Sequence, residues 1–439
     1  MCGVIGYIGH RDASPVLMQG LLRMEYRGYD SAGIAVLHNG SIKMTKVSGK
    51  IASLSEKIVN LDFTGTVGIG HTRWATHGLP NEVNAHPHSD NSGRFLLIHN
   101  GIIENFYSIK KDLSDKGYTF STDTDSEVLV QLISYLYEGD VEEAVRNALY
   151  KVRGTYGIVV LCQDEPDRLI AAKMGSPMAI GIGKGENFVA SDVAALIDYT
   201  RDVTYLEDGE LAVITHNDFK TYSFDNHKVD KKIEQIAFDI KQIEKGNYDH
   251  FMLKEIYEQP YSIRDAMRGR VRVEEGKVVL GGLFDVQKQL DEARRFIFLG
   301  CGTSWHAGLI GEYLIEDLAG IPVEVEYASE FRYRNAIIEP NTIAWAITQS
   351  GETIDTLAAL RQAREQGALP FAICNVVGSS IARESQAGVY IHAGPEIGVA
   401  STKAFTAQVT VLTQLAIKLA RERNRISHEK CQELLITFS

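Results

Sequence analysis

The first six residues, Met1-Cys2-Gly3-Val4-Ile5-Gly6, place a cysteine directly after the initiator methionine. Small and apolar residues follow it, as they do in a buried strand. Removal of Met1 leaves Cys2 with both a thiol and a free α-amine. The thiolate is the nucleophilic form of cysteine, and an α-amine titrates at about pH 7.7–8.0, so one residue can supply both nucleophile and base. The sequence therefore predicts a catalytic residue at the start of the chain.

Further segments contain the other groups that a glutamine-cleaving site requires. They are Tyr26–Gly33, His71–Gly78, His99–Asn105 and Thr124–Glu127. Such a site needs hydrogen-bond donors for an oxyanion, a cation for the α-carboxylate of the substrate and an anion for its α-amine. Asn100 and Gly101 follow an apolar strand, so a side-chain amide and a backbone N–H can converge there. The fork of Arg73 can grip a carboxylate at two points, and Asp125 can face an ammonium group.

At these residues the chain resembles the N-terminal-nucleophile glutaminase domain of class II amidotransferases, and most specifically the glutamine–fructose-6-phosphate aminotransferase family. The resemblance covers essentially the whole chain. It implies that Cys2 attacks the side-chain amide of glutamine and that Asn100 and Gly101 form the oxyanion hole. It also implies a set of glutamine-binding residues, with the tryptophan as a gate to an ammonia channel: Arg73, Trp74, Thr76, His77 and Asp125. Arg27 matches a family arginine near the nucleophile, as a supporting group or a structural ion-pair residue.

The second half of the chain alternates apolar strands, turns and helices, which indicates a parallel, doubly wound sheet. Phe296–Ser304 reads as a strand that enters a glycine turn before a helix, and Ile347–Thr353 repeats the arrangement. Backbone N–H groups at a helix N-terminus favour phosphate, and hydroxyl side chains add donors. Neither turn matches a nucleotide-binding motif. We therefore expect the two turns to hold the phosphate of a sugar.

The same resemblance implies a sugar isomerase (SIS) domain in this region. Its sugar-phosphate residues are expected at Thr303, Ser304, Thr348, Gln349, Ser350 and Thr353, with Val399 and Ser401 in a loop that lines the sugar site. Thr348 stands where the family often has serine. Lys403 belongs either to this loop or to the ordinary solvent-facing cations.

These patterns predict an α+β four-layer N-terminal-nucleophile glutaminase domain, followed by an α/β doubly wound parallel-sheet SIS domain. We expect the glutaminase domain at residues 2–225, a linker rich in lysine and acidic residues at 226–249, and a phosphosugar isomerase part at 250–439, with its first SIS domain at about 289–428. A charged helix, Ala416–Arg425, is expected near the end. The family continues with a second SIS domain and a tail that carry the isomerase acid and base. From this sequence we expect glutamine hydrolysis and part of the sugar-phosphate site.

Composition narrows the partners and the compartment. The formal net charge of -12 disfavours binding to nucleic acid or to an anionic membrane. The five cysteines are scattered without a CxxC pair, and no signal peptide or membrane-spanning run is evident, so a reducing, cytoplasmic location is expected. Histidines 71, 77, 86, 88 and 99 lack a metal-ligand spacing, so we expect no metal and no cofactor. The resemblance implies a homodimer.

The hypothesis from sequence is that the intact protein converts fructose 6-phosphate and glutamine to glucosamine 6-phosphate and glutamate, in amino-sugar biosynthesis. One alternative is another class II amidotransferase, but the chain lacks a pyrophosphate-binding acidic motif and an ATP loop. The other is a sugar-phosphate sensor built on the SIS fold, which leaves Cys2 and Arg73 unexplained.

Overall fold

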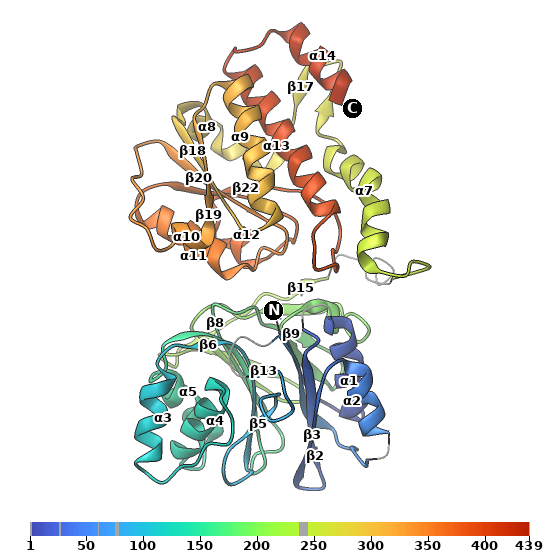
Figure 1. Cartoon of the computed structure of the whole chain (residues 1–439), viewed down its shortest axis with the longest axis vertical. Helices are drawn as coiled ribbons and strands as arrows, with labels where there is room; N and C mark the ends of the chain where they lie inside the picture. Colours follow the sequence, from blue (N-terminus) through green and yellow to red (C-terminus); the bar gives the residue numbers. More distant parts are fainter. Residues whose placement is uncertain (1, 26–27, 60, 75–78, 237–244, 439) are drawn as a thin grey trace. The chain divides into compact units, whose positions relative to one another are not determined.

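A computed structural model describes residues 2–25, 28–59, 61–74, 79–236 and 245–438 of the chain (Figure 1). Contacts divide the chain into two compact units, Met1–Ile240 and Lys241–Ser439. Thr76, His77 and Arg27 lie outside the described residues. Each unit is treated by itself below.

Two sheets form the centre of the first unit. Within the described residues, the first sheet has eight strands, in the order β15 (Glu234–Gln235), β11 (Asp202–Tyr205), β9 (Ala179–Ile182), β10 (Asn187–Ala190), β1 (Gly3–Ile8), β4 (Val67–Arg73), β2 (Ser31–His38) and β3 (Ser41–Ser48). The second has seven, in the order β14 (Lys228–Val229), β13 (Phe219–Ser223), β12 (Glu210–Ile214), β8 (Leu169–Met174), β7 (Gly154–Cys162), β6 (Phe95–Ile103) and β5 (His88–Ser89). All their pairings are antiparallel.

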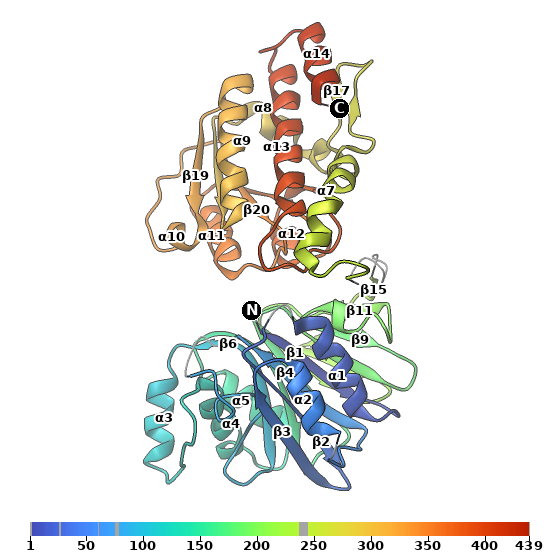
Figure 2. The ribbon, with the colours of Figure 1, turned by 45° about the vertical axis from the view of Figure 1, so that its right-hand side comes forward.

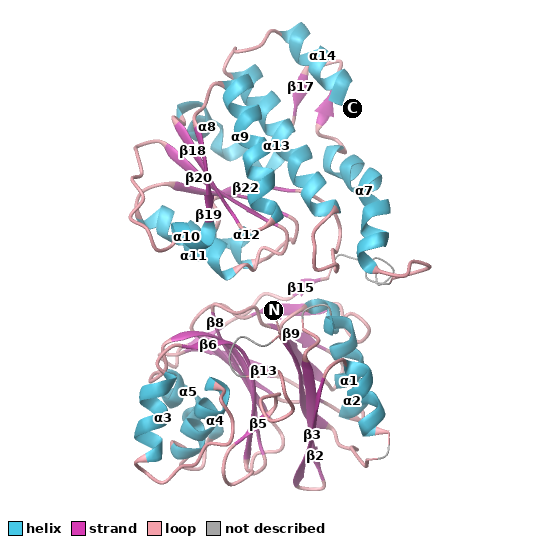
Figure 3. Ribbon diagram, viewed as in Figure 1, coloured by secondary structure: helices cyan, strands magenta, loops and turns pink. Residues whose placement is uncertain are grey.

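The two sheets pack face to face through an apolar core that includes Val4, Ile69, Ile98 and Val159. Helices cover the outer faces (Figure 3). Those on the first sheet are α1 (Ala13–Met24) and α2 (Ile51–Ile58), and those on the second include α3 (Phe106–Ser114), α4 (Asp125–Tyr135) and α5 (Val141–Leu149). The expected four-layer α+β architecture is therefore confirmed.

Strand β1 lies inside the first sheet and is buried along its whole length. It pairs with β10 on one side and with β4 on the other. Gly3 faces Thr72 in the second of these pairings, so Cys2 lies beside the residues that end β4. The apolar start of the sequence thus brings the predicted nucleophile to Arg73 and Trp74.

Part of the segment expected to be a linker belongs to the first unit. Strand β14 pairs with β13, and β15 pairs with β11, although both lie in the charged region after residue 226. Each is a two-residue edge strand, and of their four residues only Val229 is partly buried. Backbone pairing holds both, and in β15 the side chain of Gln235 also donates to Asp202 Oδ1 at 3.2 Å. Side-chain polarity does not reveal such pairing.

The second unit contains a parallel sheet, in the order β19 (Val323–Tyr327), β18 (Arg295–Gly300), β20 (Thr342–Thr348), β21 (Leu369–Cys374) and β22 (Ala387–Tyr390). Alternate residues of each strand face opposite cores. Phe296, Phe298 and Trp345 pack in one, and Ile297, Leu299 and Ala344 pack in the other. The strand order and the parallel pairing confirm the doubly wound α/β fold.

Helices cover both faces of this sheet, and the views of Figures 1 and 2 show α9 and α13 running side by side. One core contains residues of α9 (Thr303–Ala319) and α13 (Lys403–Glu422), against which α7 (Phe251–Met267) also packs. The other contains residues of α10 (Ala328–Phe331), α11 (Ile354–Glu365) and α12 (Ser380–Glu384). Smaller elements are β16 (Val271–Arg272), β17 (Lys277–Val278), η3 (Gly281–Val286) and α8 (Gln287–Glu292), with η2 (Val193–Ala195) in the first unit.

The end of the chain differs from the helix expected at Ala416–Arg425. The observed α13 begins at Lys403, and a further helix, α14 (His428–Phe438), follows it. Most of α13 is buried, including its polar residues Gln408 and Gln414, so its first half has no exposed polar face to mark it as a helix. Across the described residues, no helix is both long and apolar enough to cross a membrane.

Candidate active site

The thiol of Cys2 is held at the end of β4. The N–H of Trp74 donates to Cys2 Sγ at 3.2 Å, and the thiol lies 3.4 Å from the carbonyl oxygen of Trp74. Burial raises the pKa of the Cys2 thiol, while the hydrogen bond from the Trp74 backbone and the charge of Arg73 act to lower it. The net direction is upward, so the thiol needs a base before it can act as a nucleophile.

Asn100 lies near the end of β6 in the second sheet and reaches Cys2. Its Nδ2 donates to the carbonyl oxygen of Cys2 at 3.0 Å. Gly101 follows with φ +133°, and a Cβ at this position would lie 2.0 Å from the carbonyl oxygen of Thr155. Only glycine fits this backbone. The structure thus brings Asn100 and Cys2, the predicted nucleophile, together and holds Gly101 in the next position of the strand.

The residues expected to bind the ends of glutamine lie on two elements. Arg73 ends β4, is 4% exposed, and donates from Nη1 to the carbonyl oxygen of Leu79 at 3.2 Å. Trp74 is 41% exposed and meets the ring of Tyr29 edge-on, with 5.1 Å between centroids. The predicted Thr76 and His77 are outside the described residues.

Asp125 begins α4, which Thr124 caps by accepting the N–H of Glu127. The Asp125 carboxylate is buried, and its Oδ2 accepts the backbone N–H of Ile103 at 2.7 Å. Ile103 ends the strand that carries Asn100 and Gly101. Asp125 is therefore tied to the strand that carries Asn100 and Gly101.

Four buried histidines lie behind these residues. His71 Nε2 is 3.0 Å from Asn100 Oδ1, and its ring packs on His86 with 4.1 Å between centroids. His86 Nε2 and His99 Nδ1 are each 2.9 Å from Ser126 Oγ, and His88 Nε2 is 3.2 Å from the hydroxyl of Thr124. Burial lowers the pKa of all four imidazoles, that of His71 to about 3. The spacing of these histidines in the sequence raised only the question of a metal site. Among the described residues, no group of three or more His, Cys, Asp or Glu side chains is arranged to hold a metal ion.

In the second unit the two predicted phosphate turns lie side by side. They follow β18 and β20, which are adjacent parallel strands on either side of the point where the strand order reverses. Such a point is the usual ligand site of an open α/β sheet. Thr303 is the first residue of α9, and Thr353 precedes the first residue of α11, so both helix N-termini open at this edge.

The hydroxyls of these turns have different surroundings. Ser304 Oγ accepts the Nε2–H of Gln408 at 3.0 Å, and Ser350 Oγ accepts the N–H of Glu352 at 3.1 Å. Thr348 is 3% exposed, and its hydroxyl accepts the N–H of Gly351 at 3.1 Å. Gln349 lies between them and is half-buried. The buried hydroxyl of Thr348 is therefore used inside the turn, where it holds the N–H of Gly351.

The loop that contains Val399 and Ser401 is fixed by carboxylates. Ser401 Oγ donates to Glu396 Oε2 at 2.7 Å, while Val399 is 76% exposed at the tip. Lys403 Nζ donates to Glu258 Oε2 of α7 at 2.7 Å, and Lys403 is 3% exposed. The alternative of a solvent-facing Lys403 is therefore wrong. The sequence does not point to Glu258, because 145 residues separate it from Lys403.

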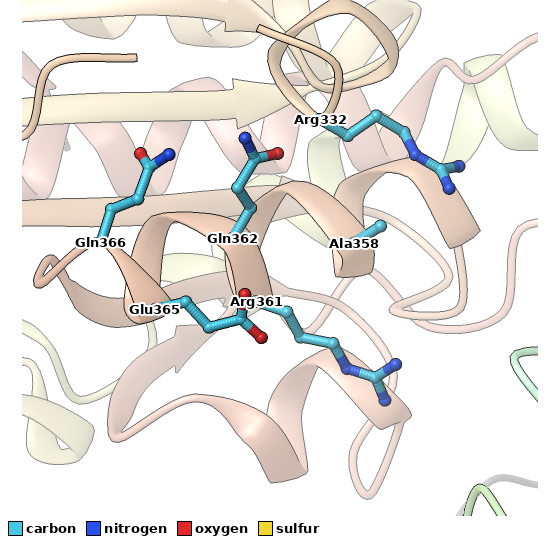
Figure 4. A pocket seen from close by; sticks show the side chains of 6 residues that line it. All are labelled: Arg332, Ala358, Arg361, Gln362, Glu365 and Gln366. Carbon is cyan, nitrogen blue, oxygen red and sulfur yellow. The ribbon is translucent and has the colours of Figure 1, made fainter. Parts of the chain in front are cut away.

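A hollow of about 510 Å³ lies on the outer side of α11 (Figure 4). Its lining residues are Arg332, Ala358, Arg361, Gln362, Glu365 and Gln366. Arg332 pairs with Asp355, and Arg361 pairs with Glu384. It contains none of the predicted site residues, and ion pairs already engage both of its arginines.

Comparison with known proteins finds two family models and several relatives that match this chain. A model of the glutamine amidotransferase domain matches residues 56–262, and a model of the SIS domain matches residues 289–418. The glutamine--fructose-6-phosphate aminotransferase (isomerizing) of Chlorobaculum tepidum is 56% identical over 438 residues, which is 98% of this chain and 71% of the relative. The protein of the same name from Bacteroides thetaiotaomicron is 53% identical over 431 residues, 97% of this chain and 70% of the relative.

A solved structure, the C-terminal domain of glucosamine-fructose-6-phosphate aminotransferase from Francisella tularensis, is 36% identical, with a TM-score of 0.42, over 44% of this chain and 54% of that one. The identity to the two curated relatives extends over nearly the whole chain and through both predicted sites. The chain belongs to the glutamine–fructose-6-phosphate aminotransferase (isomerizing) family.

Proposed function

We propose that this chain releases ammonia from glutamine at Cys2 and forms part of the fructose 6-phosphate site, and that the intact protein transfers the ammonia to fructose 6-phosphate, giving glucosamine 6-phosphate and glutamate. The observation that carries this proposal is the placement of Cys2. Its sulfur accepts a hydrogen bond from the N–H of Trp74, and its carbonyl oxygen accepts one from the side-chain amide of Asn100. A nucleophile and an oxyanion donor from different sheets meet there, as acyl transfer requires.

The chemistry begins after removal of Met1. The α-amine of Cys2 takes the proton of its own thiol, and Sγ attacks the side-chain carbonyl carbon of glutamine. The oxyanion that forms is stabilised by the Asn100 side chain and the N–H of Gly101. Collapse breaks the C–N bond, the proton returns to the leaving nitrogen as ammonia departs, and water hydrolyses the thioester to glutamate and free Cys2. Burial raises the pKa of the thiol, so the amine is needed as base.

The ends of glutamine would be held by Arg73 at the α-carboxylate and by Asp125 at the α-amine, with Trp74, Thr76 and His77 beside them. Arg73 and Asp125 are both buried. In a site with little water, a two-point guanidinium contact discriminates a carboxylate well. Glutamine analogues that lack either charged end should therefore be poor substrates.

The sugar phosphate would bind at the N-termini of α9 and α11. The proposed contacts are Thr303, Ser304, Gln349, Ser350 and Thr353, with Thr348 shaping the turn and Val399 and Ser401 lining the sugar. Two helix N-termini at neighbouring strand ends favour a dianion over a neutral sugar. Inorganic phosphate should therefore compete with fructose 6-phosphate.

The Cys2→Ala variant tests the glutaminase directly. It should release no glutamate from glutamine, while Cys162→Ala, which removes a buried thiol from the same unit, should retain the wild-type rate. Glutamate release by Cys2→Ala at the wild-type rate would contradict the proposal.

Glutamate release, measured beside calorimetry with fructose 6-phosphate, separates the enzyme from a sugar-phosphate sensor. A sensor binds the sugar phosphate but releases no glutamate from glutamine, whereas the proposed enzyme does both. A homodimer and a cytoplasmic location are also part of the proposal. The free cysteines are consistent with a reducing compartment, and sedimentation of the purified protein tests the oligomeric state.

A further inference from the structure

We propose that His71 is a positioning residue of the glutaminase, which holds the Asn100 side chain so that its amide nitrogen faces Cys2. The inference rests on the proposed function of Cys2 and Asn100. His71 lies on β4 and would itself touch none of the reacting atoms.

The orientation of the Asn100 amide follows from its neighbours. The atom of Asn100 that faces Cys2 lies 3.0 Å from the carbonyl oxygen of that residue. A carbonyl oxygen only accepts hydrogen bonds, so this atom must be Nδ2. The other amide atom, Oδ1, then points to His71 Nε2, which is 3.0 Å away.

The same neighbours fix the tautomer of His71. Its Nε2 lies 3.0 Å from Asn100 Oδ1 and 3.1 Å from the carbonyl oxygen of His99. Both are acceptors, so Nε2 must carry the hydrogen. His71 Nδ1 has no hydrogen-bond partner among the described residues, and burial lowers the pKa of the ring to about 3. The group that faces Asn100 is therefore the N–H of a neutral imidazole.

The ring of His71 has no room to turn away. The residue is fully buried in β4, where it pairs with Val4 of β1 on one side and with Gly33 of β2 on the other. The ring of His86 packs against it at an interplanar angle of 32°. A rigid donor thus holds Asn100 from behind, and this arrangement pre-organises the oxyanion donor before substrate binds.

The expected consequence is a loss of kcat without a matching change of KM. Asn100 stabilises charge that develops only in the transition state, so its misorientation should leave the binding of glutamine largely intact. Removal of one oxyanion donor lowers kcat by roughly a hundredfold to a thousandfold, so a donor that is present but free to rotate should cost about tenfold to a hundredfold.

Two substitutions distinguish the effect of the hydrogen-bond donor at Nε2 from the effect of losing the imidazole ring. The nitrogen of glutamine in His71→Gln can replace Nε2, whereas that of asparagine in His71→Asn reaches only to the place of Nδ1. We expect His71→Asn to lower kcat for glutamate release about tenfold to a hundredfold with KM within about twofold, and His71→Gln to recover most of the loss. Wild-type kcat in His71→Asn, or equal loss in both variants with unchanged thermal unfolding, would overturn the inference.

The wild-type protein offers a test that requires no substitution. Nitrogen NMR of imidazole-labelled protein should show His71 protonated at Nε2, with a coupling across the hydrogen bond to Asn100 or His99. Protonation at Nδ1 would overturn the inference even if the variants do not fold. Wild-type protein that releases no glutamate would instead contradict the proposed function, while the NMR result would still decide the role of His71.

Discussion

Glu255 of α7 accepts the backbone N–H of Gly398 at 3.0 Å, and with the same oxygen accepts that of Ile397 at 2.6 Å. Glu255 is 2% exposed, and burial raises its pKa, while the two N–H groups lower it. The loop that Glu255 holds has no helix or strand of its own between β22 and α13. Helix α7 also precedes the part of the chain that matches the SIS domain. A side chain from outside the sheet therefore fixes the loop expected to line the sugar site.

Replacing Glu255 should weaken sugar binding. In Glu255→Ala the two N–H groups lose a charged acceptor worth about 1.5–3 kcal/mol, and the loop becomes free to move. We expect the affinity for fructose 6-phosphate, measured by calorimetry, to fall about tenfold. Asp265→Asn, at the far end of the same helix, is the matched control and should bind as the wild type does. Unchanged affinity in Glu255→Ala would show that the loop is held without this carboxylate.

The buried histidines should make the first unit sensitive to acid. An unfolded histidine titrates near pH 6.5, whereas in the folded unit the pKa of His71 is about 3 and those of His86, His88 and His99 are also lowered. Below pH 6.5 the unfolded chain binds more protons than the folded one, so stability is fully present above that pH and is lost as the pH falls. A histidine that stays neutral in the folded unit contributes a slope that approaches about 1.4 kcal/mol per pH unit as the pH falls well below 6.5.

Hydrogen exchange of amides in β4 and β6 between pH 7.5 and 5.5, corrected for intrinsic rates, measures this slope. His88→Gln removes one titrating group and should reduce the loss of stability between pH 7.5 and 5.5 by about 1.4 kcal/mol in total. An unfolding free energy that stays constant down to pH 5.5 would mean that the imidazoles titrate normally in the folded unit.

The sequence predicted the elements that consist of continuous apolar runs, because such a run is visible without knowing what packs against it. The apolar strand before Asn100 and the one that begins at Phe296 were predicted because burial on both faces leaves few polar positions in them. Strand β3 (Ser41–Ser48) was missed because half of it is polar and it is held mainly by pairing with β2. The first half of α13 was missed because its polar residues are buried by contacts with distant helices.

The site residues likewise divide into those visible within one segment of the sequence and those that depend on contacts between distant segments. Cys2, Asn100 and Arg73 belong to segments whose residue types already indicate chemistry. The contact of His71 with Asn100 joins strands of two different sheets, and that of Glu255 with Ile397 joins residues 142 positions apart. Spacing within a segment carries no information about such contacts, because they depend on how the sheets and helices pack.

Gly101 should tolerate no side chain. In Gly101→Ala the new Cβ would lie 2.0 Å from the carbonyl oxygen of Thr155, on a backbone with φ +133° that alanine rarely adopts. Strand β6 must then shift against β7, which moves Asn100 as well. We expect a loss of about 2–4 kcal/mol in the unfolding free energy of the unit and of most glutamate release. Gly93→Ala is the control, because its φ is also positive but no atom lies within 4 Å of the added Cβ. Gly93→Ala should lose unfolding free energy only through the strained backbone. A larger loss in Gly101→Ala therefore measures the clash with β7. Equal losses in the two variants would show that Gly101 has no close contact.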